Sequence, residues 1–129
     1  MTDSDLISAA LDARLKAYAP YSGFQVGAAL LVEDGRVFTG GNIENISFGL
    51  TMCAERVAVG CAIQSGATKM SRLAIVADST EPVVPCGACR QVLAEFSPTL
   101  YIVSSTVAGS TQQFDLASLL PLSRQGILK

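Results

Sequence analysis

Apolar residues recur at helical spacing near the start of the chain and predict an amphipathic helix, which Asp3 or Ser4 caps and which ends at about Tyr18. Two further helices are expected over residues 53–65 and 86–96. A glycine follows the first of these and a proline follows the second, and both residue types end helices. The pattern therefore indicates three main helices.

Runs of apolar and β-branched residues predict strands. The strands are expected over residues 25–32, 36–41, 72–78, 100–104 and 111–114, with a short helix over 116–120. Asp34-Gly35 separates the first two runs and supplies the positive φ angles of a tight hairpin turn. The order of the elements predicts an α/β fold, a three-layer α/β/α sandwich with a mixed five-stranded sheet.

Length and composition narrow the possible functions. The 129 residues fit one domain over 1–129, and although half are hydrophobic, no apolar run approaches the roughly 18 residues that span a bilayer. We therefore expect no membrane partner and assign the surplus apolar surface to subunit contacts. A formal net charge of -2, without a cluster of Lys or Arg, argues against nucleic acid and favours a small uncharged substrate.

The N-terminal residues bear on the compartment. The first five are acidic and polar, without the basic and apolar regions of a secretory signal, so we expect a cytoplasmic protein. In that compartment a Cys-x-x-Cys pair binds metal or takes part in catalysis more often than it forms a structural disulfide.

Cys86 and Cys89 form such a pair, and the pair alone allows three interpretations: zinc ligands, a redox couple or two buried thiols. Cys53 offers a third thiol. All three lie at predicted helix starts, where free N–H groups and the helix dipole stabilise the thiolate that binds metal. Three sulfur ligands would leave the fourth tetrahedral position to water, as in catalytic zinc sites.

Other side chains near these cysteines need separate interpretations. Cys61 lies eight residues after Cys53, about 12 Å along the same helix, which is too far to share one zinc, so we expect a small buried hydrophobe. The sequence has no histidine, which leaves Asp or Glu as a possible fourth ligand. Arg56 and Arg90 either donate hydrogen bonds to the sulfurs or are exposed at helix ends. Spacing alone does not place the Glu55 carboxylate beside the metal, because residues i and i+2 of a helix do not share a face.

Two motifs together carry a family resemblance. Cys-Ala-Glu at 53–55 and Pro-Cys-Gly-Ala-Cys at 85–89 have the form of the two elements that zinc-dependent nucleobase deaminases share, with cysteine instead of histidine as the first ligand. Further matches are Pro-Tyr-Ser at 20–22, Val-Gly-Ala-Ala at 26–29 and Gly-Asn-Ile-Glu-Asn at 41–45. The chain thus resembles cytidine deaminases of the short, zinc-dependent, homotetrameric type over about residues 18–93.

The resemblance implies a function and a set of site residues. It implies one Zn²⁺ per subunit, held by Cys53, Cys86 and Cys89, a proton shuttle at Glu55, and a homotetramer. The implied reaction is hydrolytic deamination of cytidine and 2'-deoxycytidine to uridine and 2'-deoxyuridine with release of ammonia, in pyrimidine salvage. For the nucleoside it implies Asn42 and Glu44 at the ribose hydroxyls, Phe24 against the pyrimidine ring and the backbone at Ala54 against the base. Without it, Asn42 and Glu44 would be ordinary turn residues and Phe24 a core aromatic.

The chain departs from this family at two places. Phe48 stands where the family usually has a tyrosine, so the ring is kept and a hydroxyl that can contact ribose from a neighbouring subunit is lost. No phenylalanine follows Pro121, where many relatives have one that closes a neighbour's site. Ile127 or Leu128 would have to take its place.

Three other functions stay open at this point. A deaminase of a related nucleoside such as the antibiotic blasticidin S would share the zinc elements, although Asn42 and Glu44 favour an ordinary ribose. A thiol redox protein needs Cys86 and Cys89 alone. A non-enzymatic zinc-binding module would tolerate Glu55→Gln, which a deaminase would not.

Overall fold

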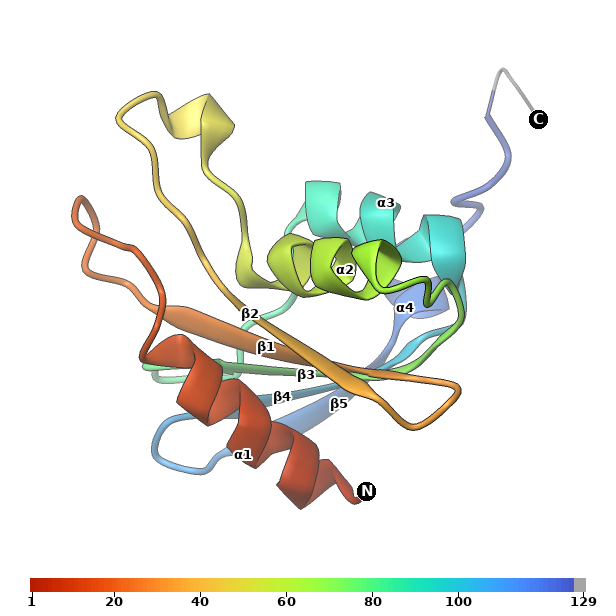
Figure 1. Ribbon diagram of the computed structural model, residues 1–129, viewed down its shortest axis with the longest axis horizontal. Coiled ribbons are helices and arrows are strands. Elements are labelled where there is room, and N and C mark those ends of the chain that lie inside the picture. The colour runs from red at the N-terminus through yellow and green to blue at the C-terminus, as the bar shows by residue number, and fades with distance from the viewer. Residues whose placement is uncertain (127–129) are drawn as a thin grey trace.

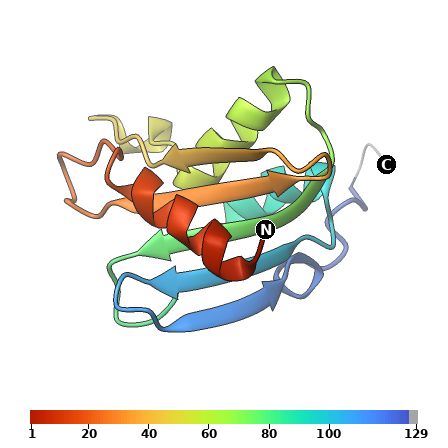
Figure 2. The same ribbon diagram turned by 60° about the horizontal axis from the view of Figure 1, so that its bottom comes forward.

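A mixed sheet forms the middle layer of the computed structural model, which describes residues 1–126 (Figure 1). Its strands are β1 (Val26–Val32), β2 (Val37–Gly41), β3 (Met70–Ala77), β4 (Tyr101–Thr106) and β5 (Thr111–Asp115). They lie side by side in the order β2-β1-β3-β4-β5 (Figure 2). β3 and β4 are parallel and the other neighbouring pairs are antiparallel, which confirms the predicted mixed five-stranded sheet.

Helices cover both faces of the sheet. α1 (Asp3–Arg14) lies on one face, whereas α2 (Ala54–Gln64), α3 (Gly87–Phe96) and the short α4 (Leu116–Leu119) lie on the other (Figure 1). Leu6 and Ala10 of α1 pack on Ala29, Ala74 and neighbouring residues of the sheet in one buried cluster. A larger cluster lies beneath α2 and α3. The predicted α/β/α sandwich is therefore confirmed, with one apolar core on each side of the sheet.

The first helix differs from its prediction at both ends. Thr2, rather than Asp3 or Ser4, is its N-cap, and the helix ends at Arg14 instead of reaching Tyr18. Tyr18 leaves the helix because its backbone binds another segment: its N–H donates to the Asn42 carbonyl and its carbonyl accepts from Glu44, both at 2.8 Å. These bonds attach the segment after α1 to the segment after β2.

Glycines fix two features that matter for the site. Gly35 has φ +95° in the β1–β2 turn, as Asp-Gly predicted. At Gly40 in β2, an added Cβ would lie 2.7 Å from both the Ala54 carbonyl oxygen and the Ala58 nitrogen. The start of α2 can therefore approach β2 backbone to backbone, which sets the height of Cys53 above the sheet.

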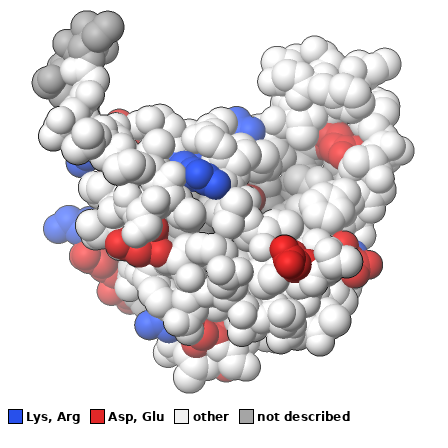
Figure 3. Space-filling model, turned by 180° about the vertical axis from the view of Figure 1, so that it is seen from behind, with Lys and Arg blue, Asp and Glu red and all other residues white. Residues whose placement is uncertain are grey.

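The helices and the charged side chains of the described residues can be compared with the features of membrane-spanning and basic surfaces. None of the helices within residues 1–126 has the length and apolarity that crossing a membrane requires. Lys and Arg side chains are scattered among acidic ones on the face shown in Figure 3, without a basic patch. The lobe at the upper right of that view is white apart from an acidic group at its lower part.

Candidate active site

Two helix N-termini bring three thiols together. Cys53 is the N-cap of α2 and Cys86 is the N-cap of α3, while Cys89 follows in the first turn of α3. α2 and α3 lie side by side on one face of the sheet (Figure 1), and the three Sγ atoms lie within 4.8 Å of one another. The Cys53 and Cys86 sulfurs are 3.7 Å apart. The predicted set of three sulfurs is thus assembled at one point.

The donor set fits zinc. Hydrogen bonds from Cys89 and Arg56 lower the pKa of the Cys53 thiol to about 5, so this sulfur is already a thiolate at neutral pH. The pKa of Cys89 is raised, because its thiol is hydrogen-bonded to Cys53 and buried, and metal binding would have to displace its proton. Within residues 1–126 the group has three members, so a tetrahedral metal here would keep an open fourth position.

Cys61 is not a fourth ligand, and its predicted burial is wrong. Its side chain is exposed, and its sulfur is not part of the group that the three other thiols form. It lines an apolar hollow between α2 and α3 together with Val57, Val92 and Phe96. No part of the described chain covers this apolar face of α2. Cys61 is therefore exposed, although cysteine is a residue type that is usually buried.

Glu55 lies beside the thiols despite its unfavourable spacing. It is 5% exposed in the first turn of α2, and burial raises the pKa of its carboxyl to about 7, to which the negative charge at Cys53 adds. A hydrogen bond with Cys89 acts in the opposite direction. The helix-face objection fails because Cys53, with φ -70° and ψ 153°, is an extended N-cap and not a helical residue. Glu55 is therefore a buried carboxyl that can gain or lose a proton near neutral pH.

The two arginines play different parts. Nη2 of Arg56 donates to the Cys53 sulfur at 3.6 Å and to the Thr51 carbonyl at 3.3 Å. Nε of Arg90 instead donates to the Pro85 carbonyl at 2.8 Å, and its Nη1 donates to Leu119 at 3.1 Å. Arg56 thus offsets charge at a sulfur, whereas Arg90 ties the loop before α3 to the end of α4.

The segments predicted to hold a nucleoside lie next to the thiols. Ile43 and Met52 exchange two backbone hydrogen bonds of 2.9 Å, which places the 42–44 stretch alongside the residue that precedes Cys53. Asn42 is 8% exposed; its Oδ1 accepts the Val26 N–H at 2.8 Å, and its Nδ2 donates to the Phe24 carbonyl at 2.9 Å. Asn42 therefore ties the stretch after β2 to the backbone at the start of β1.

Glu44 is held by a loop that sequence reasoning had assigned no role. Its Oε1 accepts backbone N–H groups of Tyr21 and Ser22 at 2.9 and 3.1 Å, and its Oε2 accepts the Ser22 hydroxyl. These bonds lower the pKa of Glu44, the Ser22 hydroxyl most strongly. A serine in a turn is the signal that could have been noticed, because its hydroxyl can accept a hydrogen bond from the backbone N–H two positions on, as Ser22 does from Phe24 at 2.9 Å.

The remaining predicted residues differ in exposure. Phe24 is 41% exposed, so it is not a core aromatic, and Ala54 is fully buried at the start of α2. Phe48 is 72% exposed in the short 3-10 helix η1 (Phe48–Leu50) and meets the Tyr21 ring edge to face, with centroids 6.0 Å apart. The exposed aromatic rings thus lie on the two loops that flank Glu44.

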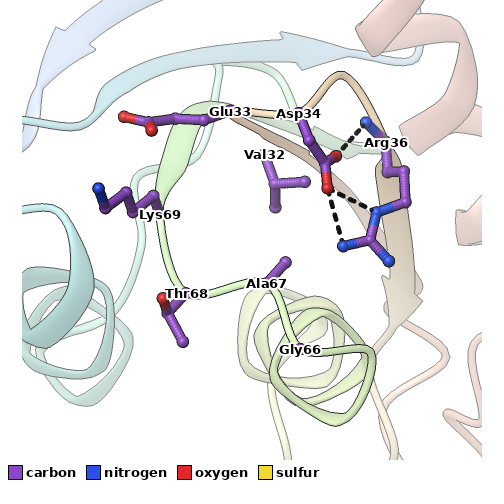
Figure 4. Close-up of a pocket in the computed structure, with 8 residues that line it drawn as sticks. All are labelled: Val32, Glu33, Asp34, Arg36, Gly66, Ala67, Thr68 and Lys69. Carbon is purple, nitrogen blue, oxygen red and sulfur yellow. Dashed lines mark hydrogen bonds and ion pairs between the residues drawn. The ribbon is translucent and has the colours of Figure 1, made fainter.

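A separate cavity of about 220 Å³ lies at the opposite end of β1, between the β1–β2 turn and the segment after α2 (Figure 4). Two of the four charged residues that line it pair with each other: Asp34 accepts hydrogen bonds from the Arg36 backbone at 3.0 Å and from the Arg36 side chain at 2.9 Å. No thiol lines it. The cavity is therefore distinct from the cysteine site.

Comparison with known proteins gives the family. The model of the cytidine and deoxycytidylate deaminase zinc-binding region matches residues 1–105. The chain belongs to this family. A cytidine deaminase of Halalkalibacterium halodurans is 50% identical over 117 residues, which cover 90% of this chain and 89% of the relative. A crystal structure of cytidine deaminase from Burkholderia pseudomallei superposes with a TM-score of 0.91 at 48% identity, covering 94% of this chain and 98% of that one.

A third relative extends the comparison. The cytidine deaminase of Mycobacterium tuberculosis strain H37Rv is 50% identical over 99 residues, 76% of this chain and 74% of the relative. The family match over 1–105 includes every predicted site residue from Phe24 to Arg90. The predicted substitutes for the family's C-terminal phenylalanine, Ile127 and Leu128, lie outside the described residues.

Proposed function

We propose that the protein catalyses zinc-dependent hydrolytic deamination of cytidine and 2'-deoxycytidine to uridine and 2'-deoxyuridine, with release of ammonia. The observation that carries the proposal is the pairing of three convergent thiols with one buried carboxyl, Glu55, whose pKa is about 7. The relatives named cytidine deaminases support the substrate. Cys53, Cys86 and Cys89 hold one zinc per subunit in this proposal.

Glu55 is the proton carrier of the proposed reaction. When bound, zinc supplies Lewis-acid chemistry that makes water a nucleophile near neutral pH. Glu55 would take up one proton of a water molecule and deliver it to N3 of the pyrimidine, which makes C4 electrophilic, while the water oxygen forms a bond to C4. It would then take the remaining proton from that oxygen and transfer it to the amino group, so that the C4–N bond breaks, ammonia leaves and the C4 carbonyl of uridine forms. A carboxyl pKa of about 7 suits both directions of transfer, because the group loses and regains its proton with little free-energy change at neutral pH.

The nucleoside is held by the two loops next to the thiols. Glu44 and Asn42 bind the ribose hydroxyls, Phe24 packs against the ring, and the backbone at Ala54 meets the base. The bonds of Asn42 to the backbone of Phe24 and Val26 keep this region in place before substrate arrives. Phe48 provides a ring without a hydroxyl and makes no polar contact with ribose.

Ultraviolet absorbance tests the reaction directly, because cytidine and uridine absorb differently. We expect zinc-loaded protein to convert cytidine and 2'-deoxycytidine. A chelator should abolish conversion, and added zinc should restore it. Protein with one zinc per chain that converts neither nucleoside would overturn the proposal.

The same proposal includes a homotetramer. The hollow between α2 and α3 has a volume of about 700 Å³ and an almost wholly apolar lining, and Ile46, Phe48 and Leu50 on the neighbouring segment are 80%, 72% and 68% exposed. Further copies of the chain would remove these surfaces from water. Light scattering should give four times the 13.4 kDa chain mass, and Val92→Arg should lower it. A wild-type protein with the mass of one chain would contradict this assembly.

We also place the reaction in cytoplasmic pyrimidine salvage. Cytidine is the product of nucleic-acid turnover, and its deamination yields uridine for reuse. A cell that can neither synthesise pyrimidines nor deaminate cytidine, given cytidine as its sole pyrimidine, should grow when it produces this protein and fail to grow with an empty vector. If the cell produced active protein and still failed to grow, the protein would deaminate cytidine without serving pyrimidine salvage.

A further inference from the structure

Ser22 connects two residues that the proposed function assigns to the nucleoside. Its Oγ donates a hydrogen bond to Oε2 of Glu44 and accepts one from the Phe24 backbone N–H at 2.9 Å. A serine hydroxyl carries one proton and two acceptor lone pairs. Because the incoming N–H occupies an acceptor position, the hydroxyl proton has a fixed direction, toward Glu44.

The hydrogen bonds of Glu44 show which of its oxygens can bind a ligand. A carboxylate offers about four acceptor positions, two on each oxygen. The N–H groups of Tyr21 and Ser22 fill both positions of Oε1. The Ser22 hydroxyl fills one position of Oε2, and the other position is left to accept a hydroxyl from outside the chain.

We propose that Ser22 is a positioning residue for nucleoside binding: it directs the last acceptor position of Glu44 at a ribose hydroxyl and couples that position to the backbone of Phe24. This inference rests on the proposed function, because it takes Glu44 and Phe24 as nucleoside-binding residues. It adds a group that does not itself touch the substrate and acts through Glu44.

The role of Ser22 concerns direction more than charge. The Ser22 hydroxyl is the largest cause of the lowered pKa of Glu44, so Ser22→Ala should raise that pKa toward its ordinary value of 4.5. Glu44 therefore stays ionised at neutral pH with or without the hydroxyl. A change in KM for the nucleoside at neutral pH would then come from a changed orientation of the Glu44 carboxylate and not from a change in its charge.

Steady-state kinetics with cytidine provide the main test. Ser22→Ala should raise KM about tenfold and leave kcat nearly unchanged, because one charge-assisted hydrogen bond no longer holds the acceptor in place. Ser22→Thr keeps the hydroxyl and should restore most of the lost affinity. In a Glu44→Ala background, Ser22→Ala should have no further effect on KM, since its target is gone.

Ser79 offers a matched control. Its hydroxyl also donates a hydrogen bond within an exposed loop, to the Glu81 carbonyl at 2.6 Å, and it has no bond to Glu44. Ser79→Ala should keep the wild-type KM. Zinc content and melting temperature should agree among the wild type, the two single Ser22 variants and Ser79→Ala, since the two amide bonds to Glu44 still close the loop when Ser22 is replaced.

A carbon-13 NMR titration of the Glu44 carboxyl supplies a second measurement that needs no turnover. Its pKa should rise in Ser22→Ala and stay low in Ser22→Thr and Ser79→Ala. An unchanged KM in Ser22→Ala, or the same loss with and without the Glu44 carboxylate, would overturn the inference. If the zinc-loaded wild type converted no cytidine, the proposed function would fail, and an unchanged Glu44 pKa in Ser22→Ala would separately overturn the role of Ser22.

Discussion

The N-terminus of α1 and those of α2 and α3 hold different kinds of cap. At α1, Thr2 Oγ1 accepts the Asp5 N–H at 3.1 Å and Asp5 Oδ2 accepts the Thr2 N–H at 2.9 Å, which forms a capping box. At α2, Cys53 makes no side-chain bond to the first turn, and at α3 Cys86 accepts a long bond of 3.5 Å from Cys89. The N-cap position thus stabilises α1, whereas at α2 and α3 it holds two sulfurs of the proposed zinc site.

The comparison shows that the site costs local stability. A thiol is a weak acceptor, so it satisfies the first N–H groups of α2 and α3 less well than an oxygen would. The same N–H groups favour a thiolate, which a metal requires. Burial of Ala54, Ala58 and Ala62 against the sheet holds α2 in place instead. The N-caps of α2 and α3 are therefore explained by the proposed metal site, and packing against the sheet stabilises the helices.

Replacement of the Cys53 thiol by serine, a preferred N-cap residue, should have the largest effect on zinc binding and turnover. Cys53→Ser should abolish zinc binding and with it all turnover, while the metal-free protein gains about 1 kcal/mol in free energy of unfolding. Metal analysis and urea denaturation of chelated protein measure the two effects. Cys61→Ser, on the same helix and outside the thiol group, is the control and should keep one zinc per chain. A Cys53→Ser protein with full zinc would contradict the ligand assignment.

Glu55→Gln separates the acid from the metal within the first turn of α2. The amide keeps the size of the side chain and cannot carry a proton, so kcat should fall by about 10²–10⁴-fold while zinc stays bound. Loss of a buried charge should also leave the fold intact. Glu33→Gln, beside the distant cavity of Figure 4, serves as control and should keep wild-type kcat. Normal turnover in zinc-loaded Glu55→Gln would exclude the proposed proton carrier.

The two arginines give a smaller and more selective effect. Arg56→Gln removes the hydrogen bond to the Cys53 sulfur and should weaken zinc binding by about tenfold to 100-fold, as the loss of groups around metal ligands does. Arg90→Gln should leave zinc affinity near wild type and lower the free energy of unfolding by about 1–3 kcal/mol, because its bonds go to carbonyls. Competition with a chelator and urea denaturation distinguish them. Equal zinc affinities in the two variants would contradict this division.

The sequence predicted the elements that carry local signals. α2 and α3 were placed within a residue or two because glycine and proline mark their ends, and the hairpin because Asp-Gly sets its turn. α1 was too long by four residues, since contacts of Tyr18 with the 42–44 stretch are not visible in helical spacing. β4 extends past Ser104 through a polar pair, Ser105 and Thr106, which pairing with β3 buries.

At the site, residue types were predictable and hydrogen-bond partners were not. The three thiols and Glu55 follow from motifs, but the different targets of Arg56 and Arg90 depend on helix phase and on α4, which lies far along the chain. Ser22 was missed because it lies in a loop defined by proline and glycine, and its partner Glu44 is 22 residues away. Contacts between loops arise from the whole fold, so single-segment reasoning cannot assign them.

The smallest effect is expected at Thr2, the N-cap of α1, which has no part in the proposed reaction. Thr2→Ala should lower the free energy of unfolding by about 1 kcal/mol and change neither zinc content nor turnover. Hydrogen bonds from Thr2, its backbone N–H first and its hydroxyl second, lower the pKa of Asp5 below 3.8. A carboxyl whose pKa is lowered by folding stabilises the fold above its unfolded pKa, and this contribution is lost as the pH falls through the lower folded value.

Urea denaturation of metal-free protein at several pH values checks this sign. Because Thr2→Ala removes the hydroxyl bond and keeps the backbone bond, the difference between wild type and variant should be largest at about pH 6. It should shrink at about pH 3 as Asp5 begins to take up a proton. A difference that stays constant with pH would mean that the hydroxyl acts on the Asp5 N–H alone. In that case the contrast with the cysteine caps would rest on hydrogen bonding without any contribution from charge.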